Sequence, residues 1–233
     1  CVLAGAGTGG GSALTPRSRV VAIRGAKGSP GCSFVAVGLA RCLARQGLST
    51  LLVDADAEEP GLGAYLDLPA AGPLPVPVAP LLWVATAGQR EGAPELLPGL
   101  RATHQAVIAD LGHHATALQR QLAEAADWVV WVVSPDPLGL ERADRALAAG
   151  GPGATSAGLV FNRIRPGCLG GAEPLLSNRH RMPVLARIRE DPRAAAPAWR
   201  GQPVESARAF RRPFQQLARC LHPDAAAVGW AWP

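Results

Sequence analysis

The stretch that decides the fold is RVVAIRGAKGSPGCS, residues 19–33. Its first part, 19–24, is mostly β-branched or apolar, which predicts a short buried strand. The residues after it are small and rich in glycine, and the following segment, 33–46, has apolar residues at helical spacing. A strand, a glycine-rich turn and a helix in this order let backbone N–H groups and a helix N-terminus converge on an anion. The stretch therefore favours a phosphate-binding loop over an ordinary strand–helix turn.

Lysine occurs once in the 233 residues, against 22 arginines, and that lysine is Lys27, inside the loop. A compact ammonium group fits a crowded phosphate site that the planar guanidinium group of arginine does not fit. A single lysine must fall somewhere by chance, but its place in the loop favours a role for Lys27 in phosphate binding.

Short apolar runs without alternation recur after the loop, and helical stretches such as 115–126 and 139–149 lie between most of them. Continuous apolar strands that alternate with helices are typical of a parallel sheet covered on both faces. The sequence thus predicts an α/β fold with a doubly wound, mostly parallel sheet, and a proline-rich surface loop at 69–80. The predicted strands after the first are 49–53, 81–85, 106–109, 128–133, 159–161 and 184–188.

Polar residues follow three of these strands at the point where each strand ends. They are Asp54 and Asp56, Asp110, and Asn162 with Arg163. Ligands of doubly wound sheets bind at the carboxyl ends of the strands. Solvated loop polarity accounts for any one of these residues but poorly for all of them in this order. They are therefore candidate site residues.

This order of motifs resembles the ParA/MinD family of dimeric deviant-Walker ATPases, from about residue 20 to residue 221. The first motif of the family reads K-G-G-x-G-K-[ST], and here 27–33 reads K-G-S-P-G-C-S. A loop of this KGSPG type resembles a variant found among actinobacterial MinD-like and pilus-assembly proteins. The resemblance implies a P-loop NTPase fold, ATP and Mg²⁺ as cofactors, and a homodimer.

The resemblance also implies roles for the catalytic and metal-binding residues. Lys27 matches the signature lysine that reaches across the dimer to the partner's phosphates, and Asp56 matches the acid that orients the attacking water. Ser33 takes the place of the Mg²⁺ ligand, Asp54 the place of the acid beside the metal, and Asp110 the place of the Walker-B acid.

The remaining implied residues bind the nucleotide. Asn162 matches the residue that hydrogen-bonds adenine, and Arg163 stands beside it. The phosphate cradle is expected to consist of Gly28, Ser29, Gly31, Cys32 and Ser33.

Two residues of the loop depart from the family pattern. Cys32 stands where the family has a lysine that touches the nucleotide phosphates of its own chain, and a neutral thiol does not replace that charge. Pro30 has no N–H to offer to a phosphate. Two functions therefore stay open. One is a weakly hydrolysing ATPase that acts as a dimeric positional switch for chromosome, septum or pilus machinery. The other is a non-hydrolysing pseudo-ATPase scaffold that localises an adaptor or cargo protein.

Positive charge is concentrated near the C-terminus. Residues 179–219 hold ten arginines against three acidic residues, a net charge of +7, whereas residues 1–178 hold 13 basic and 14 acidic residues, a net charge of −1. A basic face of this kind suits non-specific binding to the DNA backbone or to an anionic membrane surface. The alternative is a solvated face that reflects the arginine bias of the whole chain.

Two further patterns have alternative interpretations. An apolar stripe at helical spacing is expected to dock on the core, although family relatives also carry a membrane-targeting helix near the C-terminus. Its residues are Phe210, Phe214, Leu217 and Leu221. His113 and His114 follow Asp110, and because no further metal ligand is visible at a suitable spacing, an ordinary loop pair is favoured over a metal site.

The chain is expected to form one domain, 19–222, between a flexible linker or tail at 1–18 and a tail at 223–233. Its five cysteines are odd in number and include no C-x-x-C pair, which argues against a disulfide framework or a zinc ribbon. No apolar run approaches the roughly 18 residues that span a bilayer. We therefore expect a cytoplasmic protein that associates with the nucleoid or the membrane surface if its basic face binds either.

Overall fold

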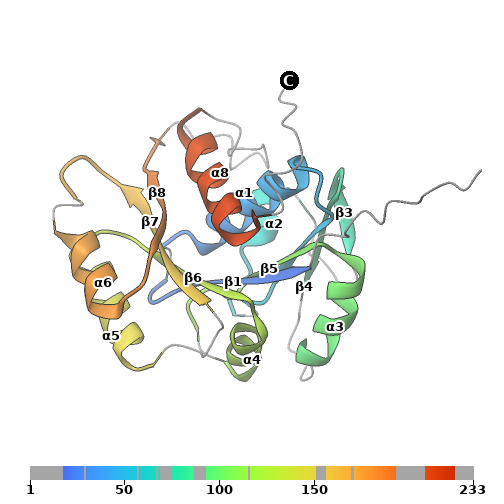
Figure 1. The fold of residues 1–233 in the computed structure, drawn as a ribbon, viewed down its shortest axis with the longest axis horizontal. Helices are drawn as coiled ribbons and strands as arrows, with labels where there is room; N and C mark the ends of the chain where they lie inside the picture. The colour runs from blue at the N-terminus through green and yellow to red at the C-terminus, as the bar shows by residue number, and fades with distance from the viewer. Residues whose placement is uncertain are drawn as a thin grey trace, which may run out of the picture.

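The computed structural model describes residues 18–28, 30–56, 58–66, 68, 75–86, 93–114, 116–150, 156–168, 171–192 and 208–223. Within these ranges an eight-stranded sheet forms the centre of the molecule, in the order β3-β4-β2-β5-β1-β6-β7-β8 (Figure 1). The strands are β1 Arg19–Gly25, β2 Thr50–Asp54, β3 Val76–Ala79, β4 Leu82–Thr86, β5 Ala106–Asp110, β6 Trp128–Val133, β7 Ser156–Ile164 and β8 Val184–Arg189. Every strand pair is parallel except β3 with β4. The predicted doubly wound, mostly parallel sheet is confirmed.

Helices cover both faces of the sheet, as Figure 1 shows. They are α1 Cys32–Arg45, α2 Leu62–Leu66, α3 Ala93–Thr103, α4 Ala117–Ala125, α5 Pro137–Ala148, α6 Ala172–His180 and α8 Arg208–Leu221. One hydrophobic core lies under α1, α2 and α8, and the other lies under α3 to α6. The central strand β1 sends Val21 and Ile23 into the first core and Val20 and Ala22 into the second. Burial on both faces explains why the strands read as continuous apolar runs.

The C-terminal helix α8 packs its apolar stripe against α1 and the sheet. Phe214 lies so close to Gly38 of α1 that a Cβ on that glycine would be 2.1 Å from the phenyl ring. The helix continues through Pro213, although a proline lacks the N–H that an interior position normally donates. All four members of the stripe, Phe210, Phe214, Leu217 and Leu221, are buried. Docking on the core is confirmed, and the alternative in which this stripe meets a membrane is wrong, because no part of it faces outward.

The proline-rich segment is only partly described, since 69–74 lie outside the described residues. The prediction of a surface loop is wrong for Val76–Ala79, which form the antiparallel edge strand β3. Pro77 pairs with Trp83 of β4. An edge strand tolerates proline because one side of it has no neighbour that needs an N–H.

The predicted terminal tails lie almost wholly outside the described residues, which begin at Ser18 and end at Pro223. Among the helices that the structure describes, none has the length and apolar character needed to cross a membrane.

Candidate phosphate-binding site

The loop between β1 and α1 lies at the carboxyl end of the central strand, between the ends of β5 and β6. Gly31 caps α1 with a φ of 94°, a left-handed conformation that glycine adopts without steric cost. A Cβ at this position would also lie 2.2 Å from the amide nitrogen of Asn162. The close approach of β7 to the loop therefore depends on glycine at position 31.

Three carboxylates gather beside the first turn of α1. Asp54 ends β2 and is paired in register with Asp110 at the end of β5, and Asp56 follows two residues after Asp54. The Ser33 hydroxyl donates a hydrogen bond to Asp110, and its oxygen would lie 2.6 Å from a Cβ on Gly61. The structure thus brings the four predicted oxygen donors, Ser33, Asp54, Asp56 and Asp110, to one place.

Asp110 is the most deeply placed of these carboxylates, with 0% of its surface exposed. Burial raises the pKa of its carboxyl group to about 7, while hydrogen bonds from Ser33 and from the Gly112 N–H oppose the rise. The neighbouring charges of Asp54 and Asp56 raise that pKa further. Burial likewise raises the pKa of Asp54, against hydrogen bonds from the backbone N–H groups of Leu62 and Asp56. Burial is thus the main cause of both pKa shifts, and the like charges of the neighbouring carboxylates add to it.

One carboxylate oxygen of the cluster is available to bind a cation. Asp110 Oδ2 is buried and has no hydrogen-bond partner among the residues that the structure describes. Carboxylate and hydroxyl oxygens are the ligands that Mg²⁺ prefers. Ser33, Asp54 and Asp110 therefore fit a magnesium ion.

Asp56 is placed between two loops rather than on a strand. Its Oδ1 accepts a hydrogen bond from the Glu59 N–H at 3.2 Å. Its Oδ2 lies so close to Gly112 that a Cβ there would be 1.7 Å away, and Gly112 also has a left-handed φ of 60°. The segment after β5 thus packs directly on Asp56, and any movement of that segment would move this carboxylate.

Cys32 occupies the position of the missing lysine and is 5% exposed. Its Sγ donates to the Gly112 carbonyl oxygen at 3.6 Å. Burial raises the thiol pKa well above its usual value, and the charges of Asp110 and Asp56 raise it further. Cys32 is therefore a neutral thiol at physiological pH and contributes no positive charge to the loop.

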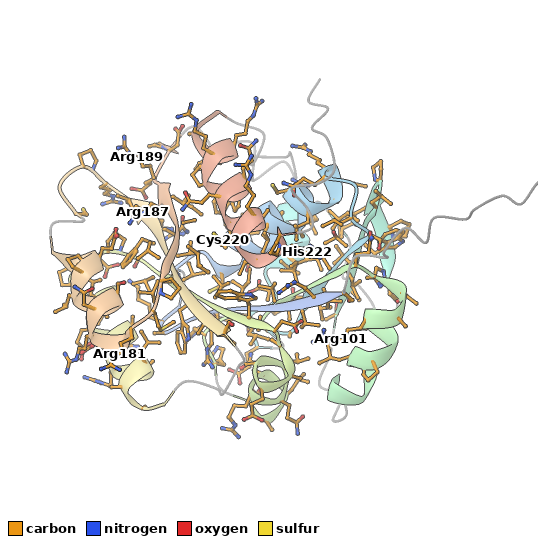
Figure 2. The ribbon with its side chains drawn as sticks, in the orientation of Figure 1. Arg101, Arg181, Arg187, Arg189, Cys220 and His222 are labelled. Carbon is orange, nitrogen blue, oxygen red and sulfur yellow. The ribbon has the colours of Figure 1, made fainter. Side chains whose placement is uncertain are left out.

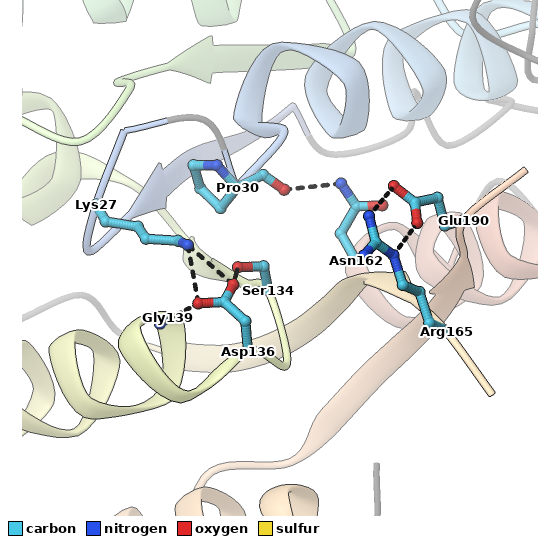
Figure 3. Close-up of polar contacts among 8 residues, drawn as sticks. All are labelled: Lys27, Pro30, Ser134, Asp136, Gly139, Asn162, Arg165 and Glu190. Carbon is cyan, nitrogen blue, oxygen red and sulfur yellow. Dashed lines mark hydrogen bonds and ion pairs between the residues drawn. The ribbon is translucent and has the colours of Figure 1, made fainter. Parts of the chain in front are cut away.

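Lys27 points toward the start of α5 (Figure 3). Its ammonium nitrogen lies 2.8 Å from one oxygen of Asp136 and 3.1 Å from the other. Asp136 also caps α5 through the Gly139 N–H at 2.8 Å and accepts a hydrogen bond from Ser134. Partial burial opposes ionisation of Asp136, but these bonds, that of Lys27 foremost, hold its pKa well below the usual range. Lys27 is thus tethered within its own chain.

Asn162 is buried at the end of β7 and faces the loop (Figure 3). Its amide nitrogen donates to the Pro30 carbonyl oxygen at 2.8 Å. Arg163 is exposed, with a positive φ of 59°. The predicted contact of Asn162 with adenine stays a prediction, and Ser29 of the predicted cradle lies outside the described residues.

Two charged residues of this region were not predicted from the sequence. Asp136 precedes a proline at the start of a helix, a pattern that indicates a helix cap but does not reveal the partner Lys27. Arg24 is buried near the end of β1, with its guanidinium carbon 4.5 Å from the ring centroid of Trp131. Its charge lowers the pKa of Cys32, so it acts electrostatically on the loop. The sequence signal that could have identified Arg24 is the presence of an arginine within an otherwise apolar strand.

Comparison with known proteins places this geometry in a family. The family model described as the CobQ/CobB/MinD/ParA nucleotide binding domain matches residues 21–204. The chain belongs to this family. Nucleotide-binding domains of this kind place their phosphate loop after the first strand, and here residues 26–31 lie between β1 and α1. A search of the curated proteins found no match.

Solved structures of MinD and ParA proteins share the fold. The septum site-determining protein MinD from Pyrococcus horikoshii, complexed with Mg-ADP, superposes with a TM-score of 0.75 at 18% identity over 92% of this chain and 100% of that one. MinD in the MinC:MinD complex of Aquifex aeolicus gives 0.76 at 19% identity over 88% and 95% of the two chains. A ParA family ATPase from Chlorobium tepidum gives 0.70 at 19% identity over 92% and 100%. At these identities the likeness concerns the fold.

Proposed function

We propose that this chain binds ATP together with Mg²⁺ and works as a weakly hydrolysing ATPase of the ParA/MinD type. The observation that carries the proposal is the buried, unpartnered oxygen of Asp110 beside Ser33 at the start of α1. Ser33, Asp54 and Asp110 would hold the metal, which supplies charge neutralisation for the phosphates. The family membership supports this assignment, and the MinD relative from Pyrococcus horikoshii carries Mg-ADP.

In this proposal Asp56 positions the attacking water. Its Oδ1 is fixed by the Glu59 N–H, and its Oδ2 packs against Gly112, so the carboxylate is oriented before any nucleotide binds. A preset acceptor of this kind can hold a water and take up its proton during attack. Hydrolysis would then depend on Asp56 more than nucleotide binding does.

The proposed ATPase is a dimer in which Lys27 contacts the second chain. To reach the phosphates of a second chain it must leave Asp136, and a partner nucleotide would compete with that carboxylate for the ammonium group. Binding of ATP by two chains would therefore exchange an ion pair within each chain for one across the dimer. A switch of this kind positions cargo by binding an adaptor or a surface only in the dimeric state.

The proposal is tested by phosphate release from Mg-ATP, measured on the wild-type chain and on Asp56→Ala. The wild type should release phosphate slowly, and the variant should lose about 10²–10⁴-fold in rate while it still binds ATP. Light scattering of the variant with ATP should show a stable dimer. Equal rates in the two proteins would remove Asp56 from the catalytic residues, and no turnover in the wild type would favour a scaffold.

The scaffold is the second candidate, and Cys32 is the observation that favours it. The loop presents a neutral thiol in place of a cation, and its neighbour Lys27 is bound to Asp136. A non-hydrolysing protein with this loop would localise partners through protein contacts alone. Besides turnover, the oligomeric state separates the two candidates, because only the ATPase is expected to dimerise when ATP is added.

We propose further that the Arg-rich segment 179–219 binds a polyanion, either DNA or an anionic membrane surface. Figure 2 shows Arg187 and Arg189 on β8, whereas Arg181 lies before the start of that strand, at the C-terminal end of α6. Arg187 is neutralised by Glu173. Because Arg181 and Arg189 lie at opposite ends of β8, Arg189→Glu and Arg181→Glu should have separate effects. Binding to duplex DNA and to anionic vesicles, compared over a salt series, distinguishes the two surfaces.

A further inference from the structure

Three potential metal ligands gather at the edge of the phosphate-binding loop, outside the magnesium site described above. They are Glu59, from the segment after β2, and His113 and His114, from the segment after β5. One carboxylate oxygen and one imidazole nitrogen from each histidine lie within 4.8 Å of one another. The centroids of the two imidazole rings lie 3.9 Å apart, with the ring planes tilted by 42°. The fold thus joins a carboxylate to the histidine pair for which the sequence offered no third ligand.

The orientation of His114 supports a role as a ligand. Its Nδ1 lies 3.1 Å from a carboxylate oxygen of Glu58. Its Nε2 is buried and has no hydrogen-bond partner among the described residues. A carboxylate at Nδ1 holds the proton on that nitrogen and leaves the lone pair of Nε2 free, which is how metal-bound histidines are commonly oriented. Glu58 is therefore placed as a positioning residue for His114.

We propose that Glu59, His113 and His114 bind a divalent transition-metal ion of the zinc type. Two imidazoles and one carboxylate suit Zn²⁺, Co²⁺ or Ni²⁺, whereas Mg²⁺ prefers oxygen ligands alone. Bonds of about 2 Å to a tetrahedral ion place ligand atoms roughly 3.3 Å apart, so small side-chain rotations close the site. Three protein ligands leave a fourth position for water or another oxygen.

The ligands belong to the two segments that surround Asp56. The Glu59 N–H is bonded to Asp56 Oδ1 at 3.2 Å, and Gly112, next to His113, packs on the other oxygen of Asp56. A Cβ on Gly28 would lie 3.7 Å from the His113 ring, so this ring borders the loop. A bound ion would link the two segments to each other beside the candidate phosphate-binding loop. Binding of the metal and of nucleotide is therefore expected to be coupled.

The test is a Co²⁺ titration of the untagged, chelator-treated full chain, followed by visible absorption. Wild-type protein should show the intense bands of four- or five-coordinate Co²⁺, which Zn²⁺ abolishes and excess Mg²⁺ leaves unchanged. His114→Ala should weaken binding about 100-fold, and Glu58→Gln about tenfold, because Glu58 acts only through His114. The matched control is His180→Ala on α6, whose imidazole contacts Asp144 and lies outside the cluster.

Circular dichroism checks that each variant folds, and Glu59→Gln carries the test if a histidine variant does not, because Glu59 is exposed. Weaker binding in Glu59→Gln, with His180→Ala unchanged, supports the site. Absence of the intense bands in the wild type would overturn the proposal. So would equal affinity in wild type and His114→Ala, or near-ultraviolet thiolate-to-cobalt bands that indicate cysteine ligation.

Discussion

The two sides of the phosphate site differ in how closely they match an ATPase. On the carboxylate side, Ser33 and Asp54 lie beside a buried oxygen of Asp110 that has no hydrogen-bond partner among the described residues, and Asp56 is held in place by backbone contacts. On the cation side, a neutral thiol replaces one lysine, and the other lysine, Lys27, is bound to Asp136. The first side gathers carboxylates, whereas on the second side one lysine is replaced by a neutral thiol and the other is held by Asp136.

If the proposed function holds, this difference makes the metal, rather than a loop cation, the main attraction for phosphate in this chain. The backbone of the loop and the N-terminus of α1 still present N–H groups to an anion. Without a lysine at position 32, however, we expect Mg²⁺ on the carboxylate side to balance the charge of a bound triphosphate. Arg24 adds a further positive charge near the loop.

The largest effect is expected when Lys27 is removed from the cation side. Lys27→Ala should lower turnover about 10²–10³-fold, because the lysine is proposed to contact the partner's phosphates, where charge develops during hydrolysis. Stability should change little, since the half-buried pair with Asp136 is still reached by solvent and contributes about 1 kcal/mol or less. Single-turnover phosphate release measures the first quantity, and urea unfolding measures the second.

Asp136→Asn is the matched variant for Lys27. Asparagine still caps α5 but no longer holds the ammonium group with a full charge. Turnover that rises or stays constant in Asp136→Asn, while it falls in Lys27→Ala, supports a lysine that must be released. A similar loss in both variants would mean that the ion pair itself is what activity requires.

A smaller effect is expected from the titration of Asp110 on the stability of the metal-free chain. The pKa of Asp110 is about 7 in the folded chain, against a usual value of 3.8. Between these values the folded chain retains a proton that the unfolded chain has released, so the free energy of unfolding falls as the pH rises. From pH 5 to pH 7 this fall should amount to about 2 kcal/mol in the wild type relative to Asp110→Asn.

Urea unfolding of both proteins in a chelator measures this difference. Comparison with the variant cancels the titration of histidines, which both chains share. If the two free energies of unfolding change in parallel with pH, Asp110 is not the buried titrating group that the structure indicates.

The smallest effect is expected when a cation is restored at position 32. Cys32→Lys should raise the affinity for ADP about tenfold, which corresponds to one favourable charge contact near the phosphates. Cys32→Met is the control, because it adds length without charge. Calorimetric titration of the two variants compares them directly, and an equal or weaker affinity in Cys32→Lys would mean that the loop no longer cradles phosphate.

Local patterns made the sheet and the carboxylates predictable from the sequence. Parallel strands buried on both faces read as apolar runs, and the acid at the end of each run falls at the sheet edge where ligands bind. Asp54 and Asp110 were placed by this rule, and the structure pairs them in register. The glycine-rich turn before an amphipathic helix is also a pattern of neighbouring residues, so it was predictable in the same way.

Contacts between segments distant in the chain were not predictable. Lys27 was expected to be free for a partner, but its ion pair with Asp136 depends on the meeting of the loop with the start of α5. The histidine pair lacked a third ligand in the sequence because Glu59 reaches it only through the fold. The edge strand β3 was predicted as a loop because prolines are rare in strands, and its pairing with β4 is not visible in the sequence.

The central claim is that the carboxylate side holds nucleotide through Mg²⁺ although the loop lacks a lysine at position 32. Calorimetric titration of ADP into the wild-type chain, with Mg²⁺ and with a chelator, tests it most directly. The account predicts that Mg²⁺ raises the affinity at least about tenfold in the wild type and has little effect in Asp110→Asn. Equal affinity with and without Mg²⁺ in the wild type, or no binding at millimolar ADP, would contradict it.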